Sequence, residues 1–404
     1  MSREKLIPID SQVIYSEDVS IILERVEQDG ARENLPDHLR VLFDYLLERQ
    51  TKAASKLPEG SRIFGPDWCR QNPRLAGELH SRIIIDTYGA TYALPNKDPE
   101  ANEKALIGNE IEMYLLCDGE RPVGTACMVI QENGWAELGR SASLGGVGNE
   151  FIQNLRILDW LVNPDLSARV VGLFATCRTA PDRNIGTNEE EVMMRGGQAV
   201  SHIWKKMPSV MVGGFGPLYK KHGSLEQFAY LYVTNKSIVV PDEVWVTECL
   251  GRDLISGFVS QYHIETQPVV STKRIDVESA VFGAGYPPIE SGITELVHGE
   301  VFLGGSMKLI DAIDELVAVE VPFIQVPVPV DCDTISIQEK LLQIGFQPFI
   351  FVPGIDGGPS PMLWFGRKRN SVAVVPTYWD TVKGENPFWG PELSNIATEI
   401  ASKW

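Results

Sequence analysis

Apolar residues recur at helical spacing near the start of the chain. Asp37 can cap a helix that extends to about Ala53, with five apolar residues on one face: Leu39, Leu42, Phe43, Leu46 and Leu47. Residues 73–88 predict a further helix, and the polar stretch Leu94–Asn102 predicts a linker. The pattern therefore indicates a helical N-terminal extension.

Alternating apolar and polar residues replace the helical pattern after this linker. Glu110–Cys117 and Val123–Gln131 alternate on either side of the turn Asp118–Pro122, which predicts a β-hairpin. After a second turn, Trp135–Ser141 predicts a third strand that continues the same sheet.

A Gly-rich stretch, Ser143–Asn149, then leads into a predicted helix at Glu150–Val162, which Asn163-Pro164 ends. Val170–Cys177 is a continuous apolar run, typical of a strand buried on both faces. Strand, turn, helix and buried strand form a crossover unit, whose strands are parallel neighbours. A hairpin joined to such a unit predicts an α/β fold with a mixed sheet.

The second half of the chain resembles the end of the first half. A helix over about Glu189–Met207 and strands at Met211–Phe215 and Phe228–Val233 complete the first half. From about Lys236 onward the pattern predicts a buried strand, a helix and two further strands: Phe323–Val330, Thr334–Gln343, Pro348–Val352 and Met362–Phe365. A Gly-Phe pair precedes the last strands of both halves, which predicts a duplicated domain.

Composition agrees with a globular protein of more than one domain. The 404 residues favour two or three domains, and the 44% apolar and 22% charged residues are ordinary values. No stretch approaches the roughly 20 apolar residues of a membrane span, and the start lacks the apolar core of a secretion signal. The six cysteines form no CxxC pair. We expect a cytoplasmic protein in a reducing environment.

The charge balance limits the partners of the protein. With 36 basic and 54 acidic residues the net charge is −18, which disfavours binding to nucleic acid and to anionic lipid. A phosphorylated cofactor remains compatible with this charge, because backbone N–H groups can hold phosphate without cationic side chains.

Three motifs together resemble the N-acetyltransferase (GNAT) superfamily in a two-domain form. Glu137–Arg140 matches the end of a family strand, Ser143–Gly148 matches the pyrophosphate loop, and Ile344–Phe346 matches the Gly-Phe feature. Ser143 stands where the family prefers Gln or Arg. The resemblance implies tandem acyl-CoA N-acyltransferase-like domains at 105–235 and 236–404, after an extension and first elements at 1–104. It also implies an acetyl-CoA or other acyl-CoA donor and a small amine or amino-acid acceptor.

A weaker similarity leaves the donor open. Trp135–Arg140 is also similar to the Trp-Glu-x-Ser-Arg signature of acyl-homoserine-lactone synthases, which take acyl groups from carrier proteins. An acyl-phosphopantetheine carrier is therefore the alternative to acyl-CoA.

The predicted donor-binding turn follows the third strand. Its residues are Ser143, Leu144, Gly145, Gly146, Val147, Gly148 and Asn149. The three glycines allow positive φ and close approach of a ligand, and the next helix offers N–H groups and a positive dipole end to a pyrophosphate. A tight turn without a ligand is the alternative. In the second half Leu303–Met307 lacks a third glycine, which favours a degenerate domain there.

Amine acylation needs a base for the amine and often an acid for the leaving thiolate. The resemblance implies Glu137, working through water, as the base, and Tyr219 is the candidate acid. A solvated glutamate and a packed tyrosine ring are the alternatives. Strand alternation places Glu137 with Gly139 on one face and Arg140 on the other.

Two arginines could bind a substrate carboxylate. Arg140 and Arg178 end neighbouring parallel strands, and a guanidinium binds a carboxylate through two bonds. Pairing with acidic neighbours is the alternative.

Other chemistries have weaker support. The six histidines form no metal-binding pair, and neither a nucleophile elbow nor a P-loop motif occurs. The aromatic tail, with Trp379, Phe388, Trp389 and Trp404, is expected to pack on the fold or to form a subunit interface, so an oligomer stays open. A non-catalytic thioester-binding or scaffold protein, or a thioester decarboxylase or hydrolase on the same fold, remains the alternative to an acyltransferase.

Overall fold

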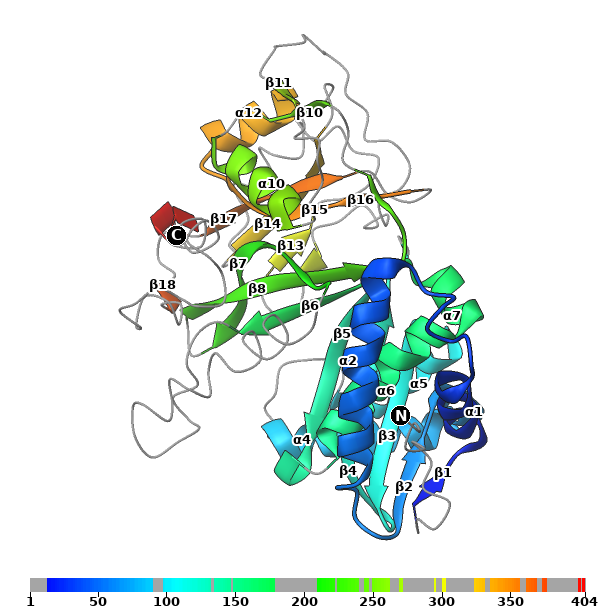
Figure 1. Cartoon of the computed structure of the whole chain (residues 1–404). Coiled ribbons are helices and arrows are strands. Elements are labelled where there is room, and N and C mark those ends of the chain that lie inside the picture. The colour runs from blue at the N-terminus through cyan, green and yellow to red at the C-terminus, as the bar shows by residue number, and fades with distance from the viewer. Residues whose placement is uncertain are drawn as a thin grey trace, which may run out of the picture. The chain divides into compact units, whose positions relative to one another are not determined.

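The computed structural model covers the whole chain and divides it into two compact units. It describes residues 13–89, 97–131, 134–146, 148–178, 209–221, 224–239, 243–246, 249–261, 269–271, 294–295, 300–302, 323–330, 335–356, 361–368, 373–375, 399–400 and 402–403. Unit 1 comprises residues 1–175 with 207–209, and unit 2 comprises 176–206 with 210–404 (Figure 1).

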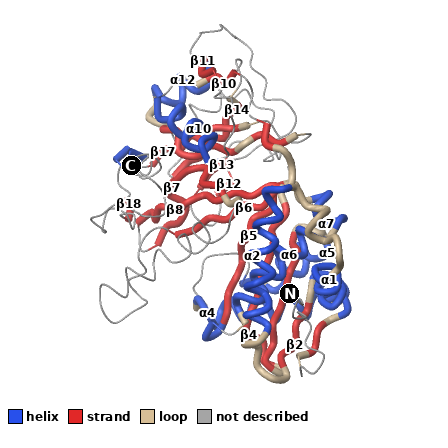
Figure 2. The backbone as a smooth tube through the Cα atoms, viewed as in Figure 1, coloured by secondary structure: helices blue, strands red, loops and turns tan. Residues whose placement is uncertain are grey.

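Unit 1 carries one mixed sheet and most of the helices that the structure describes (Figure 2). Its elements are β1 (Ile14–Tyr15), α1 (Glu17–Glu27), α2 (Asp37–Ala54), β2 (Ser61–Phe64), α3 (Pro66–Gln71), α4 (Pro73–Tyr88), α5 (Pro99–Ile107), β3 (Ile111–Asp118), β4 (Arg121–Ile130), β5 (Trp135–Ser143), a 3-10 turn (Leu144–Gly146), α6 (Asn149–Val162), α7 (Pro164–Arg169) and the first part of β6 (Gly172–Arg178).

The strands of unit 1 lie in sequence order from β1 to β6. β2, β3, β4 and β5 pair antiparallel with their neighbours, whereas β1 is parallel to β2 and β5 is parallel to β6. The predicted hairpin and the predicted parallel crossover pair are both confirmed. The predicted α/β class with a mixed sheet is confirmed as well.

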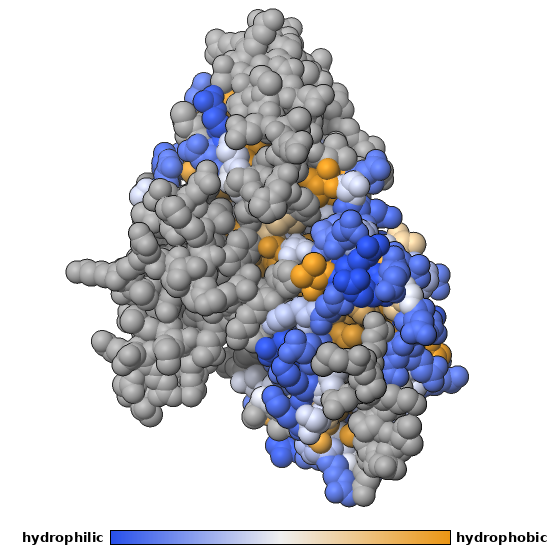
Figure 3. Space-filling model, in the orientation of Figure 1, coloured by the Kyte–Doolittle hydropathy of each residue, from blue (hydrophilic) through white to orange (hydrophobic). Residues whose placement is uncertain are grey.

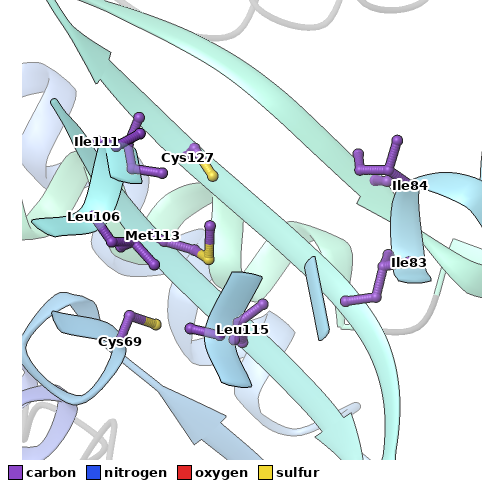
Figure 4. Packing of buried hydrophobic residues seen from close by; sticks show 11 residues of the cluster. Cys69, Ile83, Ile84, Leu106, Ile111, Met113, Leu115 and Cys127 are labelled. Carbon is purple, nitrogen blue, oxygen red and sulfur yellow. The ribbon is translucent and has the colours of Figure 1, made fainter. Parts of the chain in front are cut away.

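Helices cover both faces of this sheet. On one face α3, α4 and α5 pack on a core that includes Cys69, Ile83, Leu106, Met113 and Cys127 (Figure 4). On the other face α6 packs against β3 and β4, and the extension helices α1 and α2 pack against α6. The N-terminal part also contributes β1 and β2 to the sheet, so it is not the purely helical extension that the sequence predicts.

One helix start differs from the sequence prediction, and the short helices α5 and α7 are added. α2 begins at Asp37 itself, with Pro36 in the capping position and no side-chain cap bond. α5 replaces part of the predicted linker, because the Asp98 side chain accepts a bond from the N–H of Glu100 and starts a helix there. α6 ends at Asn163 as predicted, but Asn163 then caps the short helix α7.

A buried carboxylate ties two helices to β3. Glu112 is 2% exposed and forms ion pairs with Arg70 of α3, at 2.5 Å, and with Arg169 of α7. A carboxylate taken out of water needs such partners, since an unpaired buried charge is strongly destabilising. The two cations thus fix α3 and α7 relative to the first residues of β3.

Unit 2 is built on a second set of strands, several of them predicted. Its elements are β7 (Met211–Lys221), β8 (Ser224–Thr234), β9 (Ile238–Val239), β10 (Glu243–Trp245), α10 (Cys249–Gln261), β11 (Val269–Ser271), β12 (Thr294–Glu295), β13 (Glu300–Phe302), β14 (Phe323–Pro329), α12 (Ile335–Gln343), β15 (Gln347–Val352), β16 (Gly354–Ile355), β17 (Met362–Lys368) and β18 (Ala373–Val375).

The two Gly-Phe strand pairs lie next to each other in unit 2, in the order β8-β7-β15-β17. Each pair is antiparallel, and β7 meets β15 at Gly214 and Ile350. Side chains at Gly213 and Gly214 would collide with the backbone carbonyls of Phe351 and Phe349. The glycines of the first motif thus allow close contact between the two strand pairs.

Several predicted features fall outside the described residues. They are the helix 189–207, the second Gly-rich turn 303–307 and the aromatic tail from residue 379. The domain limits at 105–235 and 236–404 stay predictions, and the contacts of β7 and β8 group these strands with unit 2.

The described surface of unit 1 is largely hydrophilic in the view of Figure 3, with isolated hydrophobic residues. Its exposed large apolar side chains are Ile14, Ile21, Val41, Leu75 and Ile107. None of the helices within the described ranges has the length and apolar character that crossing a membrane requires.

Candidate functional site

The candidate site follows the course of β5. This strand is parallel to β6 over three pairs only, from Trp135 with Gly172 to Glu137 with Phe174. Both strands continue beyond the last pair, β5 to Ser143 and β6 to Arg178. Within the described residues the ladder therefore opens at Glu137.

Beyond the opening, β5 carries a β-bulge against β4. Gly139 pairs with Cys127 and Ala142 pairs with Thr125, so two residues of β5 stand opposite the single residue Ala126. Arg140 has φ 46, in the left-handed region that non-glycine residues rarely adopt. A bulge of this kind leaves backbone groups outside the regular ladder, and such sites occur often beside active sites.

The bulge overturns one prediction about side-chain direction. Glu137 and Gly139 do share a face, and a Cβ at position 139 would lie 3.2 Å from the Glu137 carboxyl carbon. Arg140, however, also turns to this face, where its Nη1 donates a bond of 3.3 Å to Asn102 of α5. Regular alternation fails at Arg140 because the extra residue and the positive φ rotate the strand.

A buried polar group lies next to Arg140 on the same face. Asn102 is fully buried and donates to Ser81 of α4 at 3.0 Å. His80, also fully buried, places its Nδ1 2.8 Å from the Thr125 hydroxyl and 3.9 Å from the Cys127 sulfur. Among the described residues, nothing forms a hydrogen bond with its Nε2. On this face the bulge therefore lies next to buried polar side chains as well as apolar ones.

His80 is neutral in this environment. Burial, and then the nearby Arg140 cation, lower the pKa of His80 to about 3. A general base with a pKa near 7 is therefore not supplied by this ring. Sequence analysis did not select His80, although its place on the inward face of the predicted helix 73–88 was a signal that could have identified it.

The predicted donor turn divides into an open and a closed part. Ser143 belongs to β5 and pairs with Gly124, so the turn itself begins at Leu144. Gly146, with φ 74, has open space where a side chain would stand. Gly148, with φ 60, caps α6, and a side chain there would collide with Leu116 and press on Leu57.

The first turn of α6 carries its own charges. Asn149 is the first residue of α6, and its side chain accepts a bond from Gln153 at 3.3 Å. Glu150 follows and is bonded at 2.5 Å to Arg49 of α2. A carboxylate here suits the helix dipole but would repel a bound anion, and Arg49 offsets that charge. Gly145 lies inside the 3-10 turn, whereas Val147 lies outside the described residues.

The two remaining candidates, Arg178 and Tyr219, belong to unit 2, whereas Glu137 and Arg140 belong to unit 1. Arg178 is the last residue of β6, and Tyr219 lies in β7 opposite Glu226, directly after a register shift. Their side chains lie outside the described residues, so the proposed roles of Arg178 and Tyr219 rest on the sequence.

A second buried polar pair lies on the opposite face of the sheet. The Tyr114 hydroxyl donates to the Asp159 carboxylate at 2.6 Å, and Asn163 donates to the same carboxylate at 3.1 Å. Burial raises the pKa of Asp159 to about 6, against the two hydrogen bonds that lower it. Asp159 therefore titrates just below neutral pH.

The described thiols do not provide a nucleophile. Cys69, Cys117 and Cys127 are buried and free. Burial raises the pKa of Cys117 and of Cys127 to about 11, so both are protonated at neutral pH. Nor do three or more His, Cys, Asp or Glu side chains gather as metal ligands anywhere in the described part of the chain.

The two halves of the donor turn should respond differently to substitution. We expect Gly148→Ala to lower the free energy of unfolding by roughly 3 kcal/mol, because it adds steric overlap with Leu116 to left-handed strain. Gly146→Ala, which meets open space, should cost about 1 kcal/mol from strain alone. Urea denaturation of both variants measures the difference, and equal losses would refute the closed packing of Gly148.

Two buried groups should give opposite pH dependences. His80 has a lowered pKa, so its contribution is complete above pH 6.5 and is lost as the pH falls toward about 3. Asp159 has a raised pKa, so its contribution is complete below 3.8 and is lost as the pH rises through about 6. Relative to the wild type, His80→Gln should therefore gain stability from pH 6.0 to 4.5, and Asp159→Asn should lose it, each by about 1 kcal/mol per pH unit. Urea unfolding at the two pH values tests both signs.

Comparisons with known proteins concern the fold. No protein-family model matches the chain, and no curated protein shows a significant match. Solved structures with partial likeness include an aminoglycoside 6'-acetyltransferase type Ii, at 14% identity, covering 43% of this chain and 96% of that chain, with a TM-score of 0.28. A spermidine N-acetyltransferase SpeG mutant from Vibrio cholerae matches at 14% identity, with coverages of 44% and 94% and a TM-score of 0.29.

A third such structure is an acetyltransferase of the GNAT family from Streptococcus pneumoniae, at 15% identity, with coverages of 40% and 95% and a TM-score of 0.29. All three acetyltransferases are matched over nearly their whole length, against less than half of this chain. At these identities and TM-scores the likeness carries no argument about activity.

Proposed function

We propose that this protein is an N-acyltransferase of the GNAT type, which moves an acyl group from acyl-CoA to the amine of a small molecule or amino acid. The observation that carries the proposal is the course of β5. This strand leaves its parallel neighbour after Glu137, bulges at Arg140 and runs through a glycine turn into the N-terminus of α6. A thioester site needs an open strand edge for the donor, a group that activates the amine and a binding site for the donor phosphates, and all three would lie along β5.

The donor would bind along β5. Its phosphates would lie at the turn Leu144–Asn149, where Gly146 leaves the backbone accessible and the helix dipole favours an anion. Its pantetheine arm has two amide groups and would add to the open edge of β5 like a further strand. From Ser143 back to Glu137 the strand spans roughly 20 Å, which suits such an arm.

The transfer itself would be direct. The amine nitrogen attacks the thioester carbonyl, the new C–N bond forms, and the C–S bond breaks with the electron pair on sulfur. Glu137, at the end of the paired ladder, would take the amine proton through a water molecule. Tyr219 would return a proton to the thiolate, and Arg140 with Arg178 would hold a carboxylate of the acceptor.

The second half would serve as a degenerate partner domain. The neighbouring strand pairs β7–β8 and β15–β17 support a tandem duplication, since each is antiparallel and each has a Gly-Phe pair, within β7 in the first half and directly before β15 in the second. An acyl carrier protein as donor, and assembly into an oligomer, remain open within this proposal. A non-catalytic thioester-binding or scaffold protein is the competing candidate, favoured by Ser143, which stands where the family prefers Gln or Arg.

Donor binding can be tested at Gly146 with a matched pair of variants. Asp and Asn both tolerate the left-handed region and differ only in charge. We expect Gly146→Asp to weaken acetyl-CoA binding at least tenfold through repulsion of the phosphates, and Gly146→Asn to stay within about threefold of the wild type. Calorimetric titration with acetyl-CoA and longer acyl-CoAs gives both values. Absence of binding by the wild type, or equal binding by both variants, would remove the phosphate site.

Catalysis can be tested at Glu137. Glu137→Gln keeps the shape of the side chain and removes the base, so kcat should fall by about 10²–10⁴ while the KM for acetyl-CoA changes little. Glu120→Gln, in the exposed β3–β4 turn, is the matched control. Thiol release over a panel of amines and amino acids is the assay. Binding of acyl-CoA without release of thiol from any acceptor would favour the non-catalytic candidate.

A further inference from the structure

We propose that Arg156 of α6 holds the β5 bulge open and is thereby a positioning residue of the site. The claim about the bulge stands on geometry alone, whereas its consequence for catalysis rests on the proposed function. Arg156 reaches the bulge from the face of the sheet opposite to the one on which Arg140 and Asn102 meet.

The bulge needs a stabilising partner. A non-glycine residue in the left-handed region is strained, and Arg140 adopts φ 46. The extra residue also interrupts the β4–β5 ladder between Thr125 and Cys127, so carbonyls there lose their regular strand partners. A buried carbonyl without a donor is destabilising as well. Without compensation, β5 would be more stable as a regular strand.

Arg156 supplies that compensation from one nitrogen. Its Nη1 lies 2.6 Å from the Cys127 carbonyl oxygen, 3.4 Å from the Gly139 carbonyl oxygen and 3.2 Å from the Ser141 hydroxyl. Cys127 belongs to β4, while Gly139 and Ser141 flank Arg140 in β5. One guanidinium therefore bridges both strands at the point of distortion.

Packing alone does not explain an arginine at this position. Arg156 is 5% exposed, and its neighbours along α6, Leu155, Ile157 and Leu158, already anchor the helix to the apolar core. An apolar side chain of similar length would avoid the cost of taking a cation out of water, and such replacements are often neutral or stabilising. The property that the arginine adds here is an Nη1 donor within reach of carbonyl oxygens on both strands.

The contact has a consequence on the opposite face. If residues 139–141 were regular, alternation would turn the Arg140 side chain away from Glu137 and Asn102. With the bulge in place, Arg140 lies on the face of Glu137 and donates to Asn102. Arg156 thus sets the direction of groups that it does not touch.

The test combines amide exchange with kinetics on the full chain. We expect Arg156→Met to speed hydrogen exchange at least tenfold in a peptide covering 138–143, relative to the β3 peptide 111–118. Arg156→Lys, which keeps a hydrogen-bond donor in its ammonium group, should give an intermediate exchange rate. Leu158→Ala is the matched control, because it destabilises the same helix at a side chain that cannot donate to the bulge carbonyls, and it should change both peptides in parallel.

In the acyl-transfer assay, kcat should fall at least tenfold in Arg156→Met, with partial rescue in Arg156→Lys. The KM for acetyl-CoA should stay within about threefold, because the phosphates bind at the turn and not at the bulge. If Arg156→Met does not fold, Arg156→Lys and Ser141→Ala carry the comparison. Unchanged exchange in peptide 138–143 of the folded variants would overturn the proposal. A wild type that transfers no acyl group would sink the proposed function, yet the exchange result would still decide the role of Arg156.

Discussion

A buried guanidinium that bonds to two strands at once is the contact on which the site of unit 1 depends. β5 is antiparallel to β4 along its length, parallel to β6 over three pairs only, and one residue too long for a regular ladder. These demands cannot all be met by backbone pairing. Arg156 takes up the carbonyl oxygens that the bulge releases, and so the strand can open on one edge while it stays attached on the other.

Polar groups around β5 are buried in partnerships that differ on the two faces. On one face His80 and Asn102 remain uncharged beside Arg140, which leaves the arginine as the local cation. On the other face the Tyr114 hydroxyl donates to the carboxylate of Asp159, whose pKa is raised to about 6. In a chain of net charge −18, two arginines at the bulge are a local exception.

The periodic parts of the fold could be predicted from the sequence. The hairpin, the strand 135–141, the helix after the glycines and the parallel buried strand all appear where alternation and apolar runs place them. The strand β5 is two residues longer than predicted, because Ala142 and Ser143 still pair with β4. The short helices α5 and α7 were not predicted, because each begins at an Asx cap followed by a proline and has no long apolar periodicity. The glycine turn was found because glycine is chosen for backbone geometry, which is a local property.

The sequence by itself determined the order of the elements, the glycine turn and the carboxylate that precedes it, because these follow from local periodicity and backbone freedom. Only the tertiary structure decided which way Arg140 points, that His80 backs the bulge and that Arg156 bridges two strands. Those facts depend on strand register and on side chains brought together from α4, α5 and α6. Period-two alternation assumes a regular ladder, and one inserted residue changes the face of everything that follows.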